Sequence, residues 1–205
     1  MFYSLASSAT VLPRQSNITL TSFYYAGTAC SAGTVSRSMN RDGSTITFGF
    51  DLFETHYGPG YPPAERYKNC IVYFRLSYPL GSKFEIVGTT YHGQARLDAG
   101  WNATIQSTYL ISIPGTGNGS TVTRARTTSE LIGAYTTTDT IPAGSKIASS
   151  CDWEEAQVQI TTRVKLSTSS ASVSGSLDNE SPFSLGFQQL HLGWSVCEDQ
   201  ISKRR

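Results

Sequence analysis

Large apolar residues alternate with small or polar ones through most of this chain from about residue 17 onward. The segment 45–50 reads Thr-Ile-Thr-Phe-Gly-Phe, with the large side chains at every second position. Successive side chains of a strand point to opposite faces, so this pattern predicts a strand with one apolar face. Asn40–Gly43 precedes it and ends in Asp-Gly, a pair that favours a tight hairpin turn.

The same period of two recurs further along the chain, whereas helical periodicity is never sustained over three turns. The segments that alternate are 72–78, 83–87, 102–113, 158–166 and, less regularly, 173–196. The one helical candidate is a short turn at Pro63–Arg66. We therefore predict an all-β protein, an antiparallel β-sandwich of about 8–10 strands.

A single sandwich domain is expected over residues 17–197, because large all-β domains commonly reach this length without dividing. Residues 1–16 are interpreted as a disordered N-terminal segment or the remnant of a leader. Residues 198–205 are interpreted as a C-terminal tail that contains the basic trio Lys203-Arg204-Arg205.

Four cysteines and four glycosylation sequons indicate a secreted protein. The sequons begin at Asn17, Asn102, Asn118 and Asn179. An even number of cysteines at long spacings predicts disulfides rather than a metal site. Three pairings are possible, and we expect Cys30–Cys70 and Cys151–Cys197, because pairing of neighbours in the sequence would hold the two halves of the sandwich separately.

The charge balance disfavours nucleic acid as a partner. The net charge is +1, and apart from the C-terminal trio the basic residues are scattered, whereas phosphate binding needs a concentrated basic face. No run of 18 apolar residues occurs, so no membrane span is expected.

No residue pattern in this chain predicts catalysis. His56, His92 and His191 lack metal-ligand spacing, and no histidine precedes His56 to form the N-terminal copper site of oxidative polysaccharide-cleaving enzymes. Six carboxylates could in principle form the pair that glycoside hydrolysis requires, but no motif links them. They are Asp51, Glu54, Asp98, Asp139, Glu154 and Glu155. We expect no catalytic residue, no metal and no cofactor.

Three motifs in order, AGTACSAGTVS at 26–36, STITFGFDLFETHYGPGYPPAERYKNC at 44–70 and GTTYHGQARLDAG at 88–100, resemble a family of secreted fungal proteins, domain of unknown function 4360. The resemblance continues through YTTTDTI at 135–141 to Cys197, and so covers roughly residues 17–197. It implies a small, extracellular, disulfide-bonded fungal protein and implies no activity.

Two segments interrupt the strand pattern and are expected to be surface loops. Residues 56–63 contain three prolines, which fix a rigid backbone, and residues 114–120 contain three glycines, which allow close approach to a partner. Loops clustered at one end of a sandwich often carry the binding site. The candidate partner-binding residues are Tyr57, Pro59, Tyr61, Pro62, Thr116, Gly117, Asn118 and Trp101.

From these observations we predict a secreted fungal binding protein without catalytic activity. The sharper hypothesis is an apoplastic effector whose loops inhibit a host papain-like cysteine protease, by analogy with sandwich-type inhibitors. The alternative is a cell-wall polysaccharide-binding or structural wall protein, for which exposed Tyr and Trp rings would suit sugar rings. An uncharacterised glycoside-active enzyme is the third hypothesis.

Overall fold

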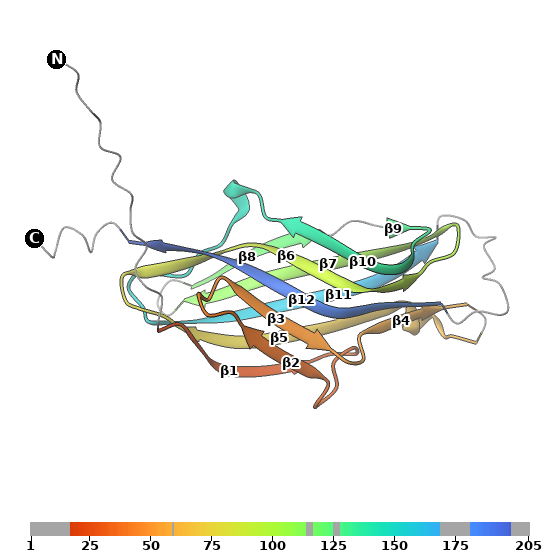
Figure 1. The fold of residues 1–205 in the computed structure, drawn as a ribbon, viewed down its shortest axis with the longest axis horizontal. Coiled ribbons are helices and arrows are strands. Elements are labelled where there is room, and N and C mark those ends of the chain that lie inside the picture. Colours follow the sequence, from red (N-terminus) through yellow and green to blue (C-terminus); the bar gives the residue numbers. More distant parts are fainter. Residues whose placement is uncertain (1–16, 59, 114–116, 125–127, 169–180, 198–205) are drawn as a thin grey trace, which may run out of the picture.

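Two antiparallel sheets of six strands each pack face to face in the computed structural model, which describes residues 17–58, 60–113, 117–124, 128–168 and 181–197 (Figure 1). The predicted β-sandwich is therefore confirmed. The described residues form twelve strands, more than expected, because β2, β4 and β9 have only two to five residues and are too short for a clear alternation. The termini at 1–16 and 198–205 lie outside the described residues.

Sheet A is ordered β1-β5-β11-β7-β8, with the short β9 paired to β7. Its strands are β1 Thr19–Ala26, β5 Tyr67–Ser77, β7 Trp101–Ile113, β8 Gly117–Arg124, β9 Thr128–Ser129 and β11 Glu155–Thr168.

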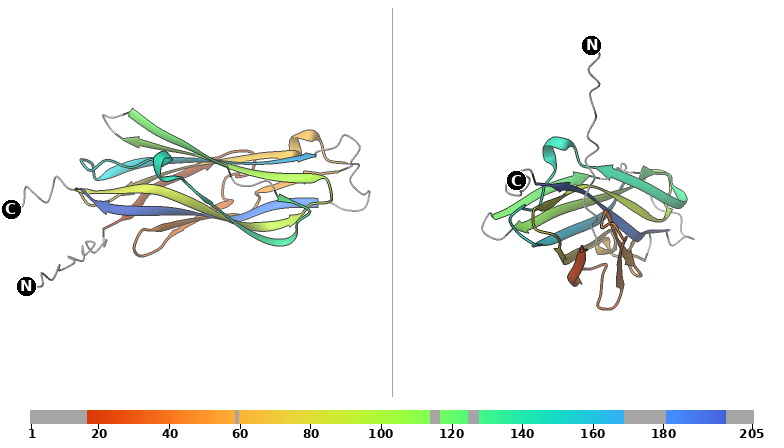
Figure 2. Two further views of the ribbon diagram at one scale, coloured as in Figure 1. Left: turned by 90° about the horizontal axis from the view of Figure 1, so that it is seen from above. Right: turned by 60° about the vertical axis from the view of Figure 1, so that its left-hand side comes forward.

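Sheet B is ordered β10-β6-β12-β3-β2, with β4 paired to β12. Its strands are β2 Val35–Met39, β3 Thr45–Phe50, β4 Glu54–Tyr57, β6 Ser82–Arg96, β10 Ile132–Thr140 and β12 Ser181–Val196. Figure 2 shows the two layers from above.

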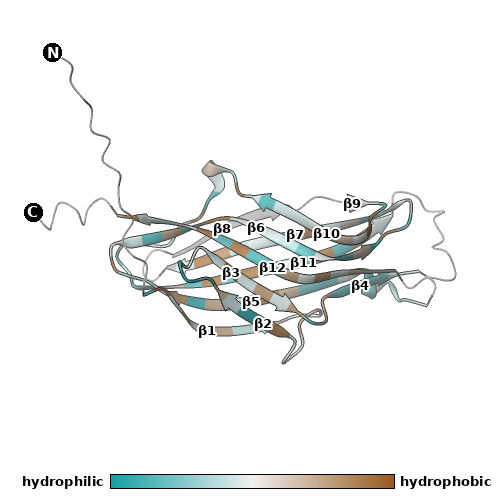
Figure 3. Cartoon of the chain, viewed as in Figure 1, coloured by the Kyte–Doolittle hydropathy of each residue, from teal (hydrophilic) through white to brown (hydrophobic). Residues whose placement is uncertain are grey.

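Alternation of apolar and polar positions builds the core between the sheets, as the colouring of Figure 3 reflects. In β3 the burial pattern follows the sequence, with Ile46, Phe48 and Phe50 buried. In β11 the buried positions include Val158, Ile160, Val164 and Leu166. The predicted strands at 72–78, 83–87 and 102–113 lie in β5, β6 and β7. Val173 and Leu177, expected in a strand, lie outside the described residues.

Both predicted turns are present. The turn before β3 is closed by a hydrogen bond from the Gly43 amide to the Asn40 carbonyl oxygen, and Gly43 has φ of 69°, the left-handed conformation that glycine adopts without strain. Pro63–Arg66 forms a 3-10 helix, η1, immediately before β5, and Ala143–Ser145 forms a second, η2, after β10.

The two disulfides pair as predicted, Cys30 with Cys70 and Cys151 with Cys197. Their placement differs from the expected stapling of two separate halves. Cys30 lies where the chain passes from β1 in sheet A to β2 in sheet B, and it is tied to β5. Cys151 lies just before β11 of sheet A, and Cys197 just after β12 of sheet B. Each bridge therefore fixes a place where the chain moves between the sheets.

A chain of buried polar side chains joins the two sheets inside the core. Thr162 donates its hydroxyl proton to the Gln188 amide oxygen at 2.8 Å. The Thr162 hydroxyl oxygen can therefore only accept from Ser107, which lies 2.9 Å away. Tyr91 donates to Ser107 at 2.7 Å. Because each hydroxyl group has one proton to donate, Tyr109 must donate to Tyr91, at 3.4 Å, and Thr89 must donate to Tyr109, at 2.5 Å. All the hydrogen bonds point in one direction, the arrangement in which neighbouring bonds strengthen each other.

Burial raises the pKa of both tyrosines in this chain above the ordinary value, that of Tyr91 most strongly. Their hydroxyl groups therefore stay protonated, and the chain from Thr89 to Gln188 keeps its direction wherever the protein is folded.

Removing the Tyr91 hydroxyl group is expected to destabilise the fold substantially. Tyr91→Phe takes the donor from Ser107 and the acceptor from Tyr109, so each of these two buried hydroxyl groups loses one of its two hydrogen bonds, at roughly 1 kcal/mol each. Tyr78→Phe is the matched control, because the partly buried Tyr78 hydroxyl group makes one bond, to the Ser150 carbonyl oxygen, at a cost of about 1 kcal/mol. Urea unfolding measures both, and equal losses would contradict the role given to the buried chain.

Loss of either disulfide is expected to lower the free energy of unfolding by about 4 kcal/mol through unfolded-state entropy, since the loops span 40 and 46 residues. The variants are Cys30→Ala/Cys70→Ala and Cys151→Ala/Cys197→Ala, measured by denaturant unfolding beside the wild type. A loss below about 1 kcal/mol for either would show that the bridge does not constrain the unfolded chain.

Candidate functional site

Two of the residues predicted to bind a partner are part of the core instead. Tyr57 and Trp101 expose only 1% and 2% of their surface, and their rings stack with centroids 4.0 Å apart. The Tyr57 hydroxyl group accepts from the Asp98 amide at 2.7 Å and donates to the Arg96 carbonyl oxygen. The prediction for Tyr57 and Trp101 is wrong, because these rings fill the end of the sandwich.

The remaining predicted residues do not converge. Tyr61 is half-buried and stacks on His56, with centroids 4.7 Å apart, and Pro62 is exposed just before η1. Gly117 and Asn118 belong to β8, where only the backbone is described, so the expected glycine loop is partly a strand. Pro59 and Thr116 lie outside the described residues.

The two segments expected to act together lie toward opposite ends of sheet A. Residues 61–66 lead directly into Tyr67, which pairs with Lys165 of β11. The β7–β8 hairpin begins at the other end, where Ser112 pairs with Gln157 of the same strand. The eight residue steps from Gln157 to Lys165 span roughly 26 Å, so the two segments lie far apart on sheet A.

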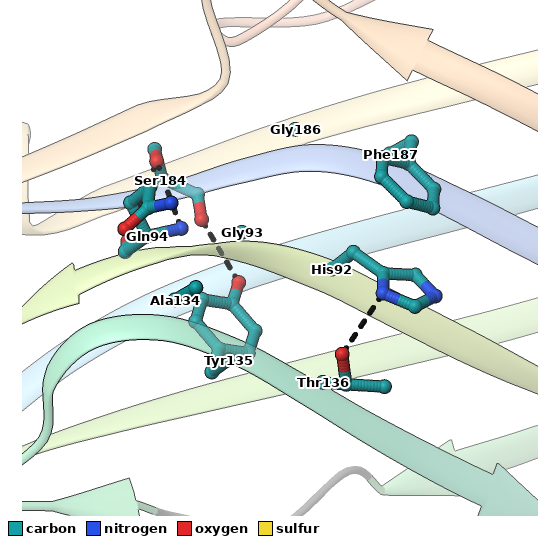
Figure 4. A pocket seen from close by; sticks show the side chains of 9 residues that line it. All are labelled: His92, Gly93, Gln94, Ala134, Tyr135, Thr136, Ser184, Gly186 and Phe187. Carbon is teal, nitrogen blue, oxygen red and sulfur yellow. Dashed lines mark hydrogen bonds between the residues drawn. The ribbon is translucent and has the colours of Figure 1, made fainter.

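A shallow pocket of about 330 Å³ lies instead on the outer face of sheet B (Figure 4). Nine residues from the neighbouring strands β10, β6 and β12 line it. Two of them, Gly93 and Gly186, have no side chain, and the space beside Gly186 is open.

An irregularity in β12 forms one wall of the pocket. The pairing of β12 with β6 shifts register between Leu185 and Phe187. Leu185 is buried, and after the shift Phe187 lies on the outer face with 37% of its surface exposed. There it stacks on the His92 ring, with centroids 4.1 Å apart and planes 19° apart. The bulge therefore presents a flat aromatic side chain that a regular strand would have turned inward.

Hydrogen bonds hold the His92 ring in place. Its Nε2 lies 3.2 Å from the Gln189 side-chain oxygen, which only accepts, so Nε2 carries the proton. Its Nδ1 is hydrogen-bonded to the Thr136 hydroxyl group at 2.9 Å, the bond drawn in Figure 4.

Tyr135 forms the other wall and depends on Gly93, with which it is directly paired. A Cβ atom on Gly93 would lie 2.7 Å from the Tyr135 ring and 1.9 Å from the Ser184 carbonyl oxygen. Without it, the Tyr135 hydroxyl group reaches across and donates to that oxygen at 2.9 Å. Burial raises the pKa of Tyr135 far above the ordinary value, so the hydroxyl group remains a donor.

The pocket combines apolar surfaces with neutral polar groups. Phe187, Tyr135 and Ala134 supply the apolar surface, and Gln94, Thr136 and Ser184 supply amide and hydroxyl groups. No carboxylate, lysine or arginine occurs among the described residues that line it. Such a lining suits a neutral ligand that has one flat apolar face and many hydroxyl groups.

The polar character continues along the same face beyond the pocket. Thr90 hydrogen-bonds to Thr138 at 3.0 Å and to His191 Nε2 at 2.9 Å. Burial lowers the pKa of His191, which favours the neutral ring. A neutral, hydroxyl-rich surface therefore extends from the pocket across β10, β6 and β12.

A match over residues 16–197 to the family model "Domain of unknown function (DUF4360)" accounts for nearly the whole described chain. The chain belongs to this family. An "Uncharacterized secreted protein" of Arthroderma benhamiae is 30% identical over 176 residues, which cover 84% of this chain and 69% of that protein. The resemblance inferred from the motifs is thus confirmed, and the DUF4360 protein is secreted, in agreement with its two disulfides.

Two solved structures were also found to be similar. TmCBM61 in complex with β-1,4-galactotriose has a TM-score of 0.31 and 6% identity, covering 85% of this chain and 88% of that one. A carbohydrate-binding module of the β-sandwich superfamily has a TM-score of 0.31 and 13% identity, covering 84% and 56%. Scores this low do not show a shared fold.

Metal and thiol chemistry find no support in the described part of the DUF4360 protein. No group of three or more His, Cys, Asp or Glu side chains there could hold a metal ion, and all four cysteines are in disulfides. Glu155 pairs with Arg75 at 3.2 Å, and Glu54 lies 3.6 Å from His56 Nε2. No helix in this part is long and apolar enough to cross a membrane.

The sequons differ in accessibility. Asn17 is exposed in a turn before β1, whereas Asn102 is half-buried within β7. Asn118 lies in β8 with only its backbone described, and Asn179 lies outside the described residues.

Sequence reasoning missed Phe187 and did not connect His92, Gly93 and Tyr135 as a site. The signal in the sequence is a weak one: the apolar residues run at 183, 185 and 187 and then shift to 190 and 192, with Gly186 beside the change. A glycine at such a break indicates a bulge.

Substitution by alanine is expected to destabilise the fold much more at Gly93 than at Gly186. Gly93→Ala places a methyl group against the Ser184 carbonyl oxygen and should cost at least about 2 kcal/mol of stability. Gly186→Ala is the matched control, because its Cβ would lie 3.6 Å from the His92 carbonyl oxygen, an ordinary contact, so its effect should stay below about 1 kcal/mol. Thermal and urea unfolding measure both, and equal effects would refute the described packing of Tyr135 over Gly93.

Proposed function

We propose that this secreted DUF4360 protein binds carbohydrate, without cleaving it, through the pocket on the outer face of sheet B. The observation that carries this proposal is the stack of Phe187 on His92 beside neutral amide and hydroxyl groups. A sugar ring has an apolar face formed by its C–H groups and hydroxyl groups around its rim. The exposed Phe187 ring would contact the apolar face of the sugar, and Gln94, Thr136 and Ser184 would hydrogen-bond to its hydroxyl groups.

A neutral oligosaccharide or polysaccharide is the ligand class that fits this lining. The described pocket offers no charge to pair with a charged ligand. The hydroxyl-rich surface around Thr90, Thr138 and His191 continues along β6 and β10, which would allow more than one sugar unit to bind. This supports the earlier alternative of a polysaccharide-binding protein.

The absence of catalysis is part of the proposal. Glycoside hydrolysis uses two carboxyl groups on either side of the scissile bond. The described lining of the pocket contains none, and the carboxylates Glu155 and Glu54 interact with Arg75 and His56 elsewhere. The pocket is therefore suited to holding a sugar and not to activating water against it.

The protease-inhibitor hypothesis is not carried forward. Two of its candidate binding residues, Tyr57 and Trp101, are buried, and its two loops lie toward opposite ends of sheet A.

Binding is tested by depletion of the purified protein onto insoluble chitin, β-glucan and cellulose, and by calorimetric titration with soluble neutral oligosaccharides of the polymer retained. The wild type is expected to bind at least one of them. Phe187→Ala removes the stacking surface and should weaken binding at least tenfold, as truncation of a central aromatic anchor commonly does.

Trp153→Ala is the matched control, because Trp153 is 42% exposed but lies beside Cys151, away from the pocket. The Trp153→Ala variant should bind the retained glycan with the same affinity as the wild type. Failure of the wild type to bind any neutral glycan, or equal losses in both variants, would remove the pocket as a sugar site.

A further inference from the structure

The outer face of sheet A carries a basic patch that the proposed pocket does not use. In β11 the residues between the buried ones point outward, and near its end these are Arg163 and Lys165, both exposed. The pairing register places Asn69 and Gln106 on either side of Arg163, and Tyr67 and Thr104 on either side of Lys165. We call Tyr67, Asn69, Gln106, Arg163 and Lys165 the sheet A patch.

The two cations of the patch are not neutralised within the described part of the molecule. Among the described residues, neither Arg163 nor Lys165 lies within ion-pair distance of a carboxylate. Glu65, two residues before Tyr67 in the chain, pairs with Lys68 at 2.8 Å. Two positions apart in a strand, the backbones of Arg163 and Lys165 are about 6.6 Å apart, so their like charges repel.

An anion placed over the patch would relieve this repulsion. Arg163 can bind a carboxylate through two parallel hydrogen bonds, and Lys165 can bind as a point charge. Because β11 is a central strand of sheet A, with β5 and β7 on either side, the patch lies in the interior of a broad face rather than at its edge. A ligand that extends across strands could therefore contact both cations at once.

The uncharged members of the patch indicate more than a simple anion site. Tyr67 is 44% exposed and stands beside Lys165 in the register, so a flat apolar surface adjoins a positive charge. Asn69 accepts a hydrogen bond from Thr28 through its side-chain oxygen, which leaves its NH₂ group for a ligand. Aromatic surface, amide groups and cations together match a sugar ring that bears a carboxylate.

From this charge complementarity we propose that the sheet A patch is a second binding site, for an acidic polysaccharide built of uronic acid units. Since the protein is secreted, the polyanion it meets is an extracellular one. The site is separate from the pocket, because the pocket lies on the outer face of sheet B and the two outer faces point away from each other (Figure 2).

The test uses polygalacturonate as the acidic probe, with calorimetric titration at low and at physiological salt. The wild type should bind it, and more weakly as salt screens the charges. Arg163→Gln/Lys165→Gln should lose at least tenfold in affinity. Arg41→Gln/Lys83→Gln is the charge-matched control, because it lowers the net charge by the same two units. Arg41 lies in the turn before β3 and Lys83 lies in β6, so this variant should bind polygalacturonate like the wild type.

Three further measurements decide between explanations. Tyr67→Ala should weaken binding without changing its salt dependence. Phe187→Ala should keep full affinity for polygalacturonate, so that failure of the pocket and failure of the patch are distinguished. Single-stranded DNA should bind more weakly than polygalacturonate, because it lacks the carboxylated sugar ring.

The proposal is overturned if the wild type does not bind polygalacturonate at low salt, or if both double variants lose affinity equally, since general charge attraction would then explain binding. Equally tight binding of DNA would overturn the preference for acidic sugars. Loss of polygalacturonate binding in Phe187→Ala would show that there is one site only. Unfolding temperatures of all variants establish that each is folded, as expected for substitutions at exposed positions.

Discussion

The buried hydrogen-bond chain between the sheets is the constraint on which the outer surfaces depend. The buried hydroxyl groups of Tyr91, Ser107 and Thr162 and the side-chain oxygen of Gln188 are hydrogen-bonded across the core, so they fix how far one sheet can slide over the other. Tyr91 and Gln188 also hold two strands in register, because a slip of one residue would pull both side chains out of the core. His92 follows Tyr91 in β6, and Phe187 precedes Gln188 in β12. The interior network therefore determines that these two rings meet on the outer face.

Placement of the aromatic residues separates packing from recognition in this protein. Tyr57 and Trp101 stack on each other inside the sandwich, and Arg66 lies over the Trp101 ring at 5.0 Å from its centroid. Phe187 is held by a neighbouring ring but keeps one side open to solvent. Phe187 is therefore available to a ligand because the His92 ring supports one of its faces and the neighbouring Gly186 has no side chain to cover it.

Much of the fold could be predicted from the sequence, whereas the site could not. Period-two segments such as 45–50 and 158–166 identify their strands because each strand has one face in the core. The disulfide partners also followed from order in the chain. Tyr57 was misjudged because proline and glycine beside it suggested a loop, while β4 pairs it into sheet B. The pocket brings together β6, β10 and β12, and neither this neighbourhood nor the bulge beside Gly186 follows from local pattern alone.

The positions of the disulfides have a consequence for survival outside the cell. One bridge encloses residues 30–70, which contain β2, β3 and β4, and the other encloses residues 151–197, which contain all of β11 and β12. An extracellular protease that cuts a single peptide bond within either segment leaves the two fragments covalently joined. The severed strand would stay close to its neighbours and could reassemble with them as an intramolecular step. A nicked molecule would thus keep its sheets together where an unbridged sandwich would lose a piece by diffusion.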